Sequence, residues 1–162
     1  MSAGSKQNGF TYLGILIFVA VSGAALAAFG ELASHAGQRE KEAELLFRGN
    51  AVQAAIASYY KKEQRYPQSL EQLLEDKRFP MPVRHLRRLY TDPMTGAADW
   101  ALVEAPGGGV MGVHSRSDAA PIKTGNFRLQ NEGFETAERY TDWKFIHSPT
   151  GPVPAVAKSS AK

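Results

Sequence analysis

The side chains that most often carry out chemistry are scattered through this chain of 162 residues. Ser115 follows His114, but adjacency in sequence does not supply the geometry of a nucleophile and its base. Residues 107–109 are three glycines, yet no Gly-Lys-Ser/Thr follows them, so they do not form a phosphate-binding loop. The four histidines share no metal-ligand spacing, and we expect them at the surface or in a hairpin: His35, His85, His114 and His147. These residues do not predict an enzyme.

Composition limits the classes of protein further. There are no cysteines, which excludes disulfides, a thiol nucleophile and a cysteine zinc site. A hydrophobic content of 43% and a charged content of 22% are typical of a folded domain. The formal net charge of +3 is too small to indicate a nucleic-acid partner.

A long uncharged segment runs from Phe10 to Gly30. About 20 apolar residues are what a helix needs to cross roughly 30 Å of hydrocarbon, so we expect this segment to span a membrane. Lys6 precedes it, and Glu31 and the mixed charges of residues 39–42 follow it. This charge pattern favours a cytoplasmic amino terminus and an exported remainder.

The same segment has a second interpretation. Ala25-Leu26-Ala27 has the form of a signal-peptidase site, and cleavage after Ala27 would release a soluble periplasmic binding protein. Against this, the helical pattern continues without proline from Ala27 to Tyr60. A bitopic protein that never polymerises is a third alternative.

The start of the run, Gly9-Phe10-Thr11 after a polar leader, resembles the processing site of type IV pilins and type II secretion pseudopilins. The resemblance implies that a prepilin peptidase cuts after Gly9, that Phe10 becomes the methylated first residue, and that the helix is retained. It also implies partners: other pseudopilin subunits, the peptidase, an inner-membrane assembly platform, and membrane lipid before assembly. Nucleic acid is not expected among them, although a competence-type DNA-uptake pseudopilin stays an alternative.

One position departs from the family. A glutamate is usual at the fifth mature residue, where this chain has Gly14. In the family, subunits that lack this glutamate are associated with the filament tip, so Gly14 favours a minor subunit. Small residues on the run allow close approach of neighbouring helices: Gly14, Ala20, Gly23, Ala24 and Ala27.

We predict a pilin-like α+β fold, in which a long N-terminal helix has a membrane-spanning first half and packs on a small antiparallel sheet. The predicted helix ends near Arg65, because Pro67 follows. Gly30, Gly37 and Gly49 each weaken it by about 1 kcal/mol relative to alanine. Its inner face is predicted to hold Leu45, Val52, Ile56 and Tyr59, covered by Trp100, Val103 and Trp143.

Further elements follow along the chain. Residues 69–72 predict a capping box that opens a short helix with Leu70, Leu73 and Leu74 inward, and residues 91–96 predict a turn. The expected strands are residues 100–104, 110–115 and 140–145. A Tyr-Pro pair (residues 66–67) and the Asp-Pro-x-x-Gly segment of residues 92–96 strengthen the resemblance. The predicted parts are leader 1–9, helix 10–30, exported domain 31–147, and a disordered tail 148–162.

Two further features stay open at this point. Some related pseudopilins bind calcium near the Asp-Pro-x-x-Gly segment, but the spacing of Asp92, Asp99 and Asp118 fits no loop motif, and we assign no metal residue. A basic cluster could bind DNA, pair with acidic faces of neighbouring subunits, or stay solvated: Arg84, Arg87 and Arg88.

Overall fold

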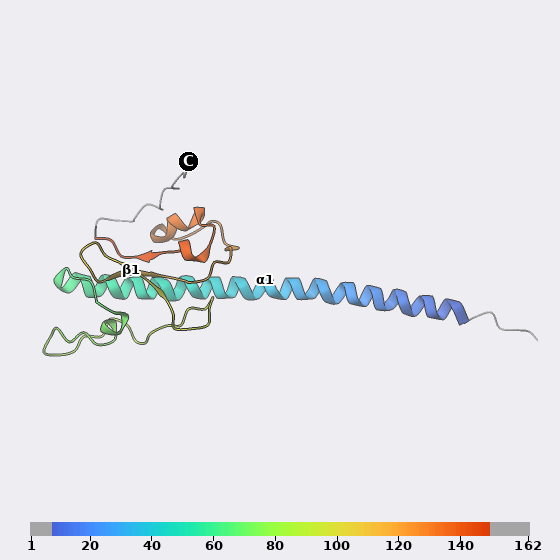
Figure 1. Ribbon diagram of the computed structural model, residues 1–162, viewed down its shortest axis with the longest axis horizontal. Coiled ribbons are helices and arrows are strands. Elements are labelled where there is room, and N and C mark those ends of the chain that lie inside the picture. The colour runs from blue at the N-terminus through green and yellow to red at the C-terminus, as the bar shows by residue number, and fades with distance from the viewer. Residues whose placement is uncertain (1–7, 150–162) are drawn as a thin grey trace, which may run out of the picture. The chain divides into compact units, whose positions relative to one another are not determined.

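A computed structural model describes the backbone of residues 8–149 and the side chains of residues 12–23 and 35–149. By their internal contacts, residues 1–38 and residues 39–162 form two units. The first element, α1 (Asn8–Glu63), contributes to both (Figure 1). The predicted leader residues 1–7 and the tail residues 150–162 lie outside the described residues.

The end of α1 lies close to its predicted position. The backbone N–H of Gln64 donates to the Tyr60 carbonyl at 2.7 Å, and Gln64 has a positive φ of 57°. A residue in the left-handed region just after a helix is a common way to stop it. Lys61 and Lys62 lie in the last turn, where positive charge interacts favourably with the helix dipole and stabilises the helix end.

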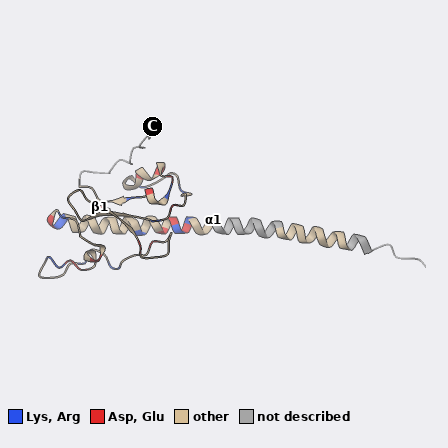
Figure 2. Cartoon of the chain, in the orientation of Figure 1, with Lys and Arg blue, Asp and Glu red and all other residues tan. Residues whose placement is uncertain are grey.

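Residues 12–23 of α1 carry no charged side chain, in contrast to the part of the helix beyond Gln38 (Figure 2). Their large apolar side chains are exposed, from 49% for Leu16 to 72% for Phe18. Among the described residues, no helix is long and apolar enough to cross a membrane. The side chains of residues 10–11 and 24–30 of the predicted span lie outside the description, and the span stays a prediction.

The unit of residues 39–162 contains a three-stranded antiparallel sheet in the order β1-β2-β3. Strands β1 (Ala101–Glu104) and β2 (Val110–His114) form the predicted hairpin, with Leu102 opposite Val113. The connecting turn uses positive φ at Gly108 (85°) and Gly109 (87°), which only glycine adopts readily. Strand β3 (Phe145–Ile146) pairs with β2 through Gly112 and Val113. The mixed α+β class with a small antiparallel sheet is therefore as predicted.

The core of this unit lies between α1 and the sheet. All four residues of the predicted inner helix face are buried, at most 5% exposed: Leu45, Val52, Ile56 and Tyr59. Trp100 and Trp143 are buried in the same cluster, as predicted. Val103 was predicted there wrongly, since it is only half-buried in β1 and does not belong to the cluster. Val110, Val113 and Phe145 supply the sheet side of the core instead.

Two C-terminal segments differ from the sequence prediction. Residues 140–145 were predicted as a strand, but η3 (Tyr140–Asp142) is a 3₁₀ helix and only Phe145 belongs to β3. The cause is the Asp142 carboxylate, which accepts from the backbone N–H of Arg139 at 3.1 Å and closes a turn there. The helix η2 (Leu129–Thr136) was not predicted at all.

The short helix after α1 is present as η1 (Leu70–Leu73), a 3₁₀ helix. Leu73 is buried and Leu70 and Leu74 are half-buried, as predicted. The predicted capping box is wrong, because the Ser69 side chain makes no cap hydrogen bond. Gln72 Oε1 instead accepts from the backbone N–H of Gln68 at 2.9 Å.

Candidate functional site

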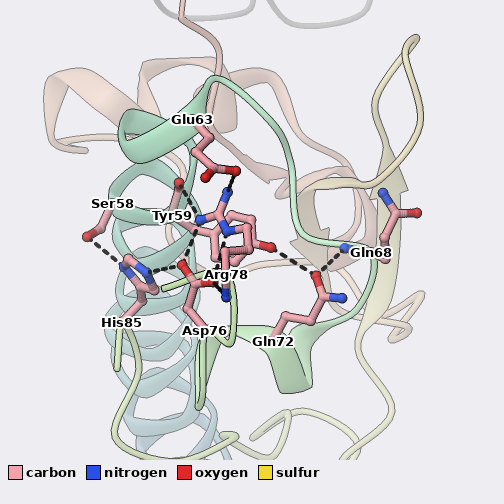
Figure 3. Close-up of polar contacts among 8 residues, drawn as sticks. All are labelled: Ser58, Tyr59, Glu63, Gln68, Gln72, Asp76, Arg78 and His85. Carbon is pink, nitrogen blue, oxygen red and sulfur yellow. Dashed lines mark hydrogen bonds and ion pairs between the residues drawn. The ribbon is translucent and has the colours of Figure 1, made fainter. Parts of the chain in front are cut away.

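The densest group of polar contacts surrounds the buried carboxylate of Asp76, whose side chain is 1% exposed (Figure 3). An isolated two-residue bridge between Asp76 and Val83 closes the loop of residues 77–82. Arg78 within this loop and His85 just after it both contact the same carboxylate. Asp76 therefore joins the segment after η1 to the end of α1.

Arg78 binds Asp76 as a fork. Its Nε lies 2.8 Å from Oδ1 and its NH2 lies 2.7 Å from Oδ2, the bidentate geometry of strong arginine–carboxylate pairs. The guanidinium also donates to Glu63 Oε2 at 3.3 Å and to the Tyr59 carbonyl at 3.2 Å. Its carbon lies 3.6 Å from the centroid of the Tyr59 ring, a cation–π contact.

The charges of this group shift each other's titration. Hydrogen bonds from Arg78 hold the pKa of the Asp76 carboxyl well below its usual range, although burial opposes this. The same bonds raise the pKa of Arg78. Burial raises the pKa of the neighbouring Tyr59 hydroxyl, which donates to Gln72 Oε1 at 3.1 Å.

His85 corrects the expectation that every histidine lies at the surface or in a hairpin. Its side chain is 1% exposed, with Nε2 3.3 Å from Asp76 Oδ2 and Nδ1 2.8 Å from Ser58 Oγ. Sequence reasoning missed this alignment because Ser58 and His85 are 27 residues apart and neither belongs to a motif.

The Ser58–His85–Asp76 alignment has the order of a proton relay, but its surroundings favour a structural role. Ser58 lies inside α1, where backbone N–H groups bond to the preceding turn and cannot receive an oxyanion. The Asp76 carboxylate is already neutralised by the Arg78 fork. The arrangement therefore acts as a clamp that fixes residues 68–85 to α1.

A recess of about 490 Å³ opens beside this clamp. Residues on its wall come from α1, from η1 and from the loop after η1: Tyr59, Glu71, Gln72, Glu75, Asp76, Lys77 and Arg78. Lys77 and Glu75 pair with each other at 3.5 Å on its exposed rim. The Arg78 guanidinium already donates to oxygens of Asp76, Glu63 and Tyr59. Its charge is therefore not available to bind an anion in the recess.

The predicted turn at residues 91–96 is present and is built around Asp92. Its carboxylate is fully buried and accepts from the backbone N–H of Met94 at 2.8 Å and from Ser115 Oγ at 2.6 Å. The N–H of Gly96 donates to the Asp92 carbonyl, and Gly96 has a φ of 76°. Asp92 caps the predicted turn and also ties it to Ser115 at the end of β2.

Acidic side chains do not converge into an ion site in the described part of the chain, where no three His, Cys, Asp or Glu residues could hold a metal. Asp99 bonds to Thr95 Oγ1 at 2.6 Å, and Asp118 pairs with Arg139 at 3.6 Å. The structure thus does not bring together Asp92, Asp99 and Asp118.

The residues predicted for processing and helix packing lie on α1. Gly9 and Phe10 are in its first turn, and their side chains lie outside the description, as do Ala24 and Ala27. Ala20 is exposed, and a Cβ placed on Gly14 or Gly23 would have no atom within 4 Å. Arg84, Arg87 and Arg88 are all exposed, and the guanidinium of Arg88 lies 5.4 Å from the centroid of the Tyr90 ring.

Comparison with protein-family models, with curated proteins and with solved structures finds no match to this chain.

Proposed function

We propose that this protein is a structural subunit of a pseudopilin type, which assembles into a short periplasmic filament of a type II secretion or related pilus-like system. Before assembly, residues 10–30 would anchor it in the bacterial inner membrane, with a cytoplasmic amino terminus and a periplasmic domain. The proposal rests on the sequence resemblance at Gly9-Phe10 and on one structural observation.

That observation is the exposure of the apolar part of α1. From Tyr12 to Val21, every large apolar side chain is at least 49% exposed. Contiguous apolar surface of this kind marks a site that lipid or another protein covers. Covering one leucine- or phenylalanine-sized side chain contributes about 1.5–3 kcal/mol, so the whole segment favours a covered state strongly.

The small residues of the segment favour neighbouring helices as the partners that bury this apolar surface in the assembled filament. Gly14 and Gly23 leave open space where a side chain would stand, and Ala20 is exposed between them. Helices approach each other closely at such positions. A bundle of identical or related helices would therefore replace lipid once subunits leave the membrane.

Gly14 also indicates whether this chain is a minor subunit or the main subunit of the filament. An ionised carboxylate in hydrocarbon is costly unless it is paired, so family members that carry one at this position are expected to pair it with a neighbour. Gly14 cannot make that pair, which favours a minor subunit over the main one.

A photoreactive benzophenone side chain at Ala20 tests assembly in cells that retain the native assembly system. Because Ala20 would lie in the filament core, illumination is expected to link this chain covalently to neighbouring subunits and to give species larger than the monomer. The same probe in a Gly9→Val background, where processing is blocked, is the matched control and should give only monomer. Monomer in both strains would identify a plain anchor, and loss of the probe from the mature chain would identify release after Ala27.

A further inference from the structure

A surface patch on the unit of residues 39–162 combines exposed apolar and basic side chains. Phe47 of α1 is 66% exposed and meets Tyr90 edge-on, with ring centroids 6.5 Å apart. The Arg88 guanidinium lies 5.4 Å from the centroid of the same Tyr90 ring, and Leu89 is 36% exposed. Arg87 is exposed and precedes Arg88 in the chain, and we include it in what we call the basic–aromatic patch: Phe47, Arg87, Arg88, Leu89 and Tyr90.

The charges of this patch lack acidic partners in the described part of the chain. No ion pair there involves Arg84, Arg87 or Arg88. The nearby Arg48 is already used, since it pairs with Glu44 and donates to the Thr91 carbonyl at 2.5 Å. The patch therefore presents unneutralised positive charge beside apolar surface, and a complementary partner must be acidic and partly apolar.

The helix η2 presents such a surface. In a 3₁₀ helix, side chains three residues apart lie directly above one another. Asn131 and Phe134 form the buried row of η2. Another row forms what we call the acidic ridge: Leu129, Glu132 and Glu135. All three are exposed, Leu129 by 80%.

The acidic ridge is also unsatisfied within its own chain. No ion pair among the described residues involves Glu132 or Glu135. Like charges on adjacent turns of a helix repel each other, so a cationic partner would remove a local cost. Leu129 at the start of the ridge offers apolar surface that can cover the exposed parts of Phe47 and Leu89.

We propose that the basic–aromatic patch of one copy of this chain binds the acidic ridge of a second copy. Arg87 and Arg88 pair with Glu132 and Glu135, and Leu129 covers Phe47 and Leu89. In Figure 1, η2 and the segment that contains residues 84–91 lie on opposite sides of α1. One copy can then use both surfaces at once, and such a head-to-tail contact continues from copy to copy.

This inference rests on the proposed function, in which subunits assemble side by side, and adds to it the surfaces that meet. It also requires at least two adjacent copies, which a single tip subunit would not provide.

The absence of cysteine makes the contact testable by disulfide formation between two differently tagged full-length chains. One chain carries Leu89→Cys and the other Leu129→Cys, and both are expressed with the native assembly system. We expect mixed 89–129 dimers to exceed either homodimer by at least about tenfold, because a head-to-tail contact brings only these two positions together. Equal amounts of all three dimers, or none, would overturn the proposal.

Charge reversal provides the second measurement. Arg88→Glu on the Leu89→Cys chain should reduce the mixed dimer about tenfold, since like charges across an interface are repulsive. Glu132→Arg on the Leu129→Cys chain should restore it, whereas Glu71→Arg, at an exposed acid away from η2, should not. Rescue by Glu71→Arg, or no effect of Arg88→Glu, would count against the specific pairing.

The two proposals can fail separately. If the benzophenone at Ala20 gives cross-linked species but the 89–129 dimer is absent, the filament proposal stands and the docking surfaces are wrong. If purified protein binds DNA with a steep salt dependence that Arg88→Glu removes, the patch serves nucleic acid and the docking proposal is overturned.

Discussion

The ring of Phe145 in β3 lies directly against the backbone of Gly49 in α1. A Cβ placed on Gly49 would come within 2.5 Å of Phe145 Cζ, closer than two carbon atoms can approach. Phe145 is fully buried, so the ring has little room to move. Gly49 therefore sets how closely the sheet can approach the helix.

Gly49→Ala should destabilise the domain by a net of up to about 2 kcal/mol. Overpacking costs about 1–3 kcal/mol, and the better helix propensity of alanine returns only about 1 kcal/mol. Gly37→Ala is the matched control, because a Cβ there meets no atom within 4 Å and should be neutral or stabilising. Urea unfolding of the full chain in detergent, followed by tryptophan fluorescence, measures both. Equal effects of the two variants would contradict the packing argument.

Asp76→Asn should cost about 3 kcal/mol of unfolding free energy, since the partly buried Arg78 guanidinium loses its bidentate carboxylate and keeps, among the described residues, only the 3.3 Å ion pair with the exposed Glu63. Glu75, the residue before Asp76, forms only an exposed pair with Lys77 in the described part of the chain. Glu75→Gln is therefore the matched control and should change the free energy of unfolding by no more than about 0.5 kcal/mol. Denaturant midpoints with unchanged m-values would measure both. A small effect of Asp76→Asn would mean that the clamp contributes little.

Acid should weaken this clamp in a defined range of pH. The folded-state pKa of Asp76 lies below its ordinary value of 3.8, so its contribution to stability is complete above that value and is lost as pH falls further. The difference in unfolding free energy between wild type and Asp76→Asn should therefore be constant above about pH 5 and shrink below about pH 4. A difference that does not change down to pH 3 would contradict the assignment.

Asp92→Ala should destabilise the domain by about 2–3 kcal/mol, because it leaves the Met94 N–H and the buried Ser115 hydroxyl without their acceptor. Asp99→Ala, a half-buried acid in the same segment, loses one exposed bond to Thr95 and should cost less than about 1 kcal/mol. Thermal unfolding with and without added calcium measures both changes. A calcium-dependent rise in wild-type stability that Asp92→Ala abolishes would give Asp92 a metal-binding role.

Sequence patterns predicted the features that depend on local periodicity. The buried face of α1 at Leu45, Val52 and Ile56 follows from helical spacing, and the β1–β2 hairpin follows from two apolar runs around a glycine loop. The turn at Asp92 follows from the preference of aspartate, proline and glycine for defined turn positions.

The features that were missed depend on contacts between distant residues. Phe145 packs on Gly49, and His85 packs beneath Ser58, only after the chain has folded back on α1. Residues 140–142 form a 3₁₀ helix in place of the predicted strand because the Asp142 carboxylate accepts a hydrogen bond from the Arg139 N–H. The alternation of apolar and polar side chains does not predict this local side-chain to backbone bond. Helix η2 has a period of three residues, which is hard to recognise over so short a segment.

The mature amino terminus distinguishes a processed filament subunit from a plain anchor and from a protein released after Ala27. Mass spectrometry of the protein from its native membrane should find a chain that begins with N-methylated Phe10. Gly9→Val should leave the leader attached, whereas Gly4→Val, the same change elsewhere in the leader, should not. A mature chain that begins at Ala28, or one that retains Met1 in the wild type, would contradict the proposal that this protein is a processed filament subunit.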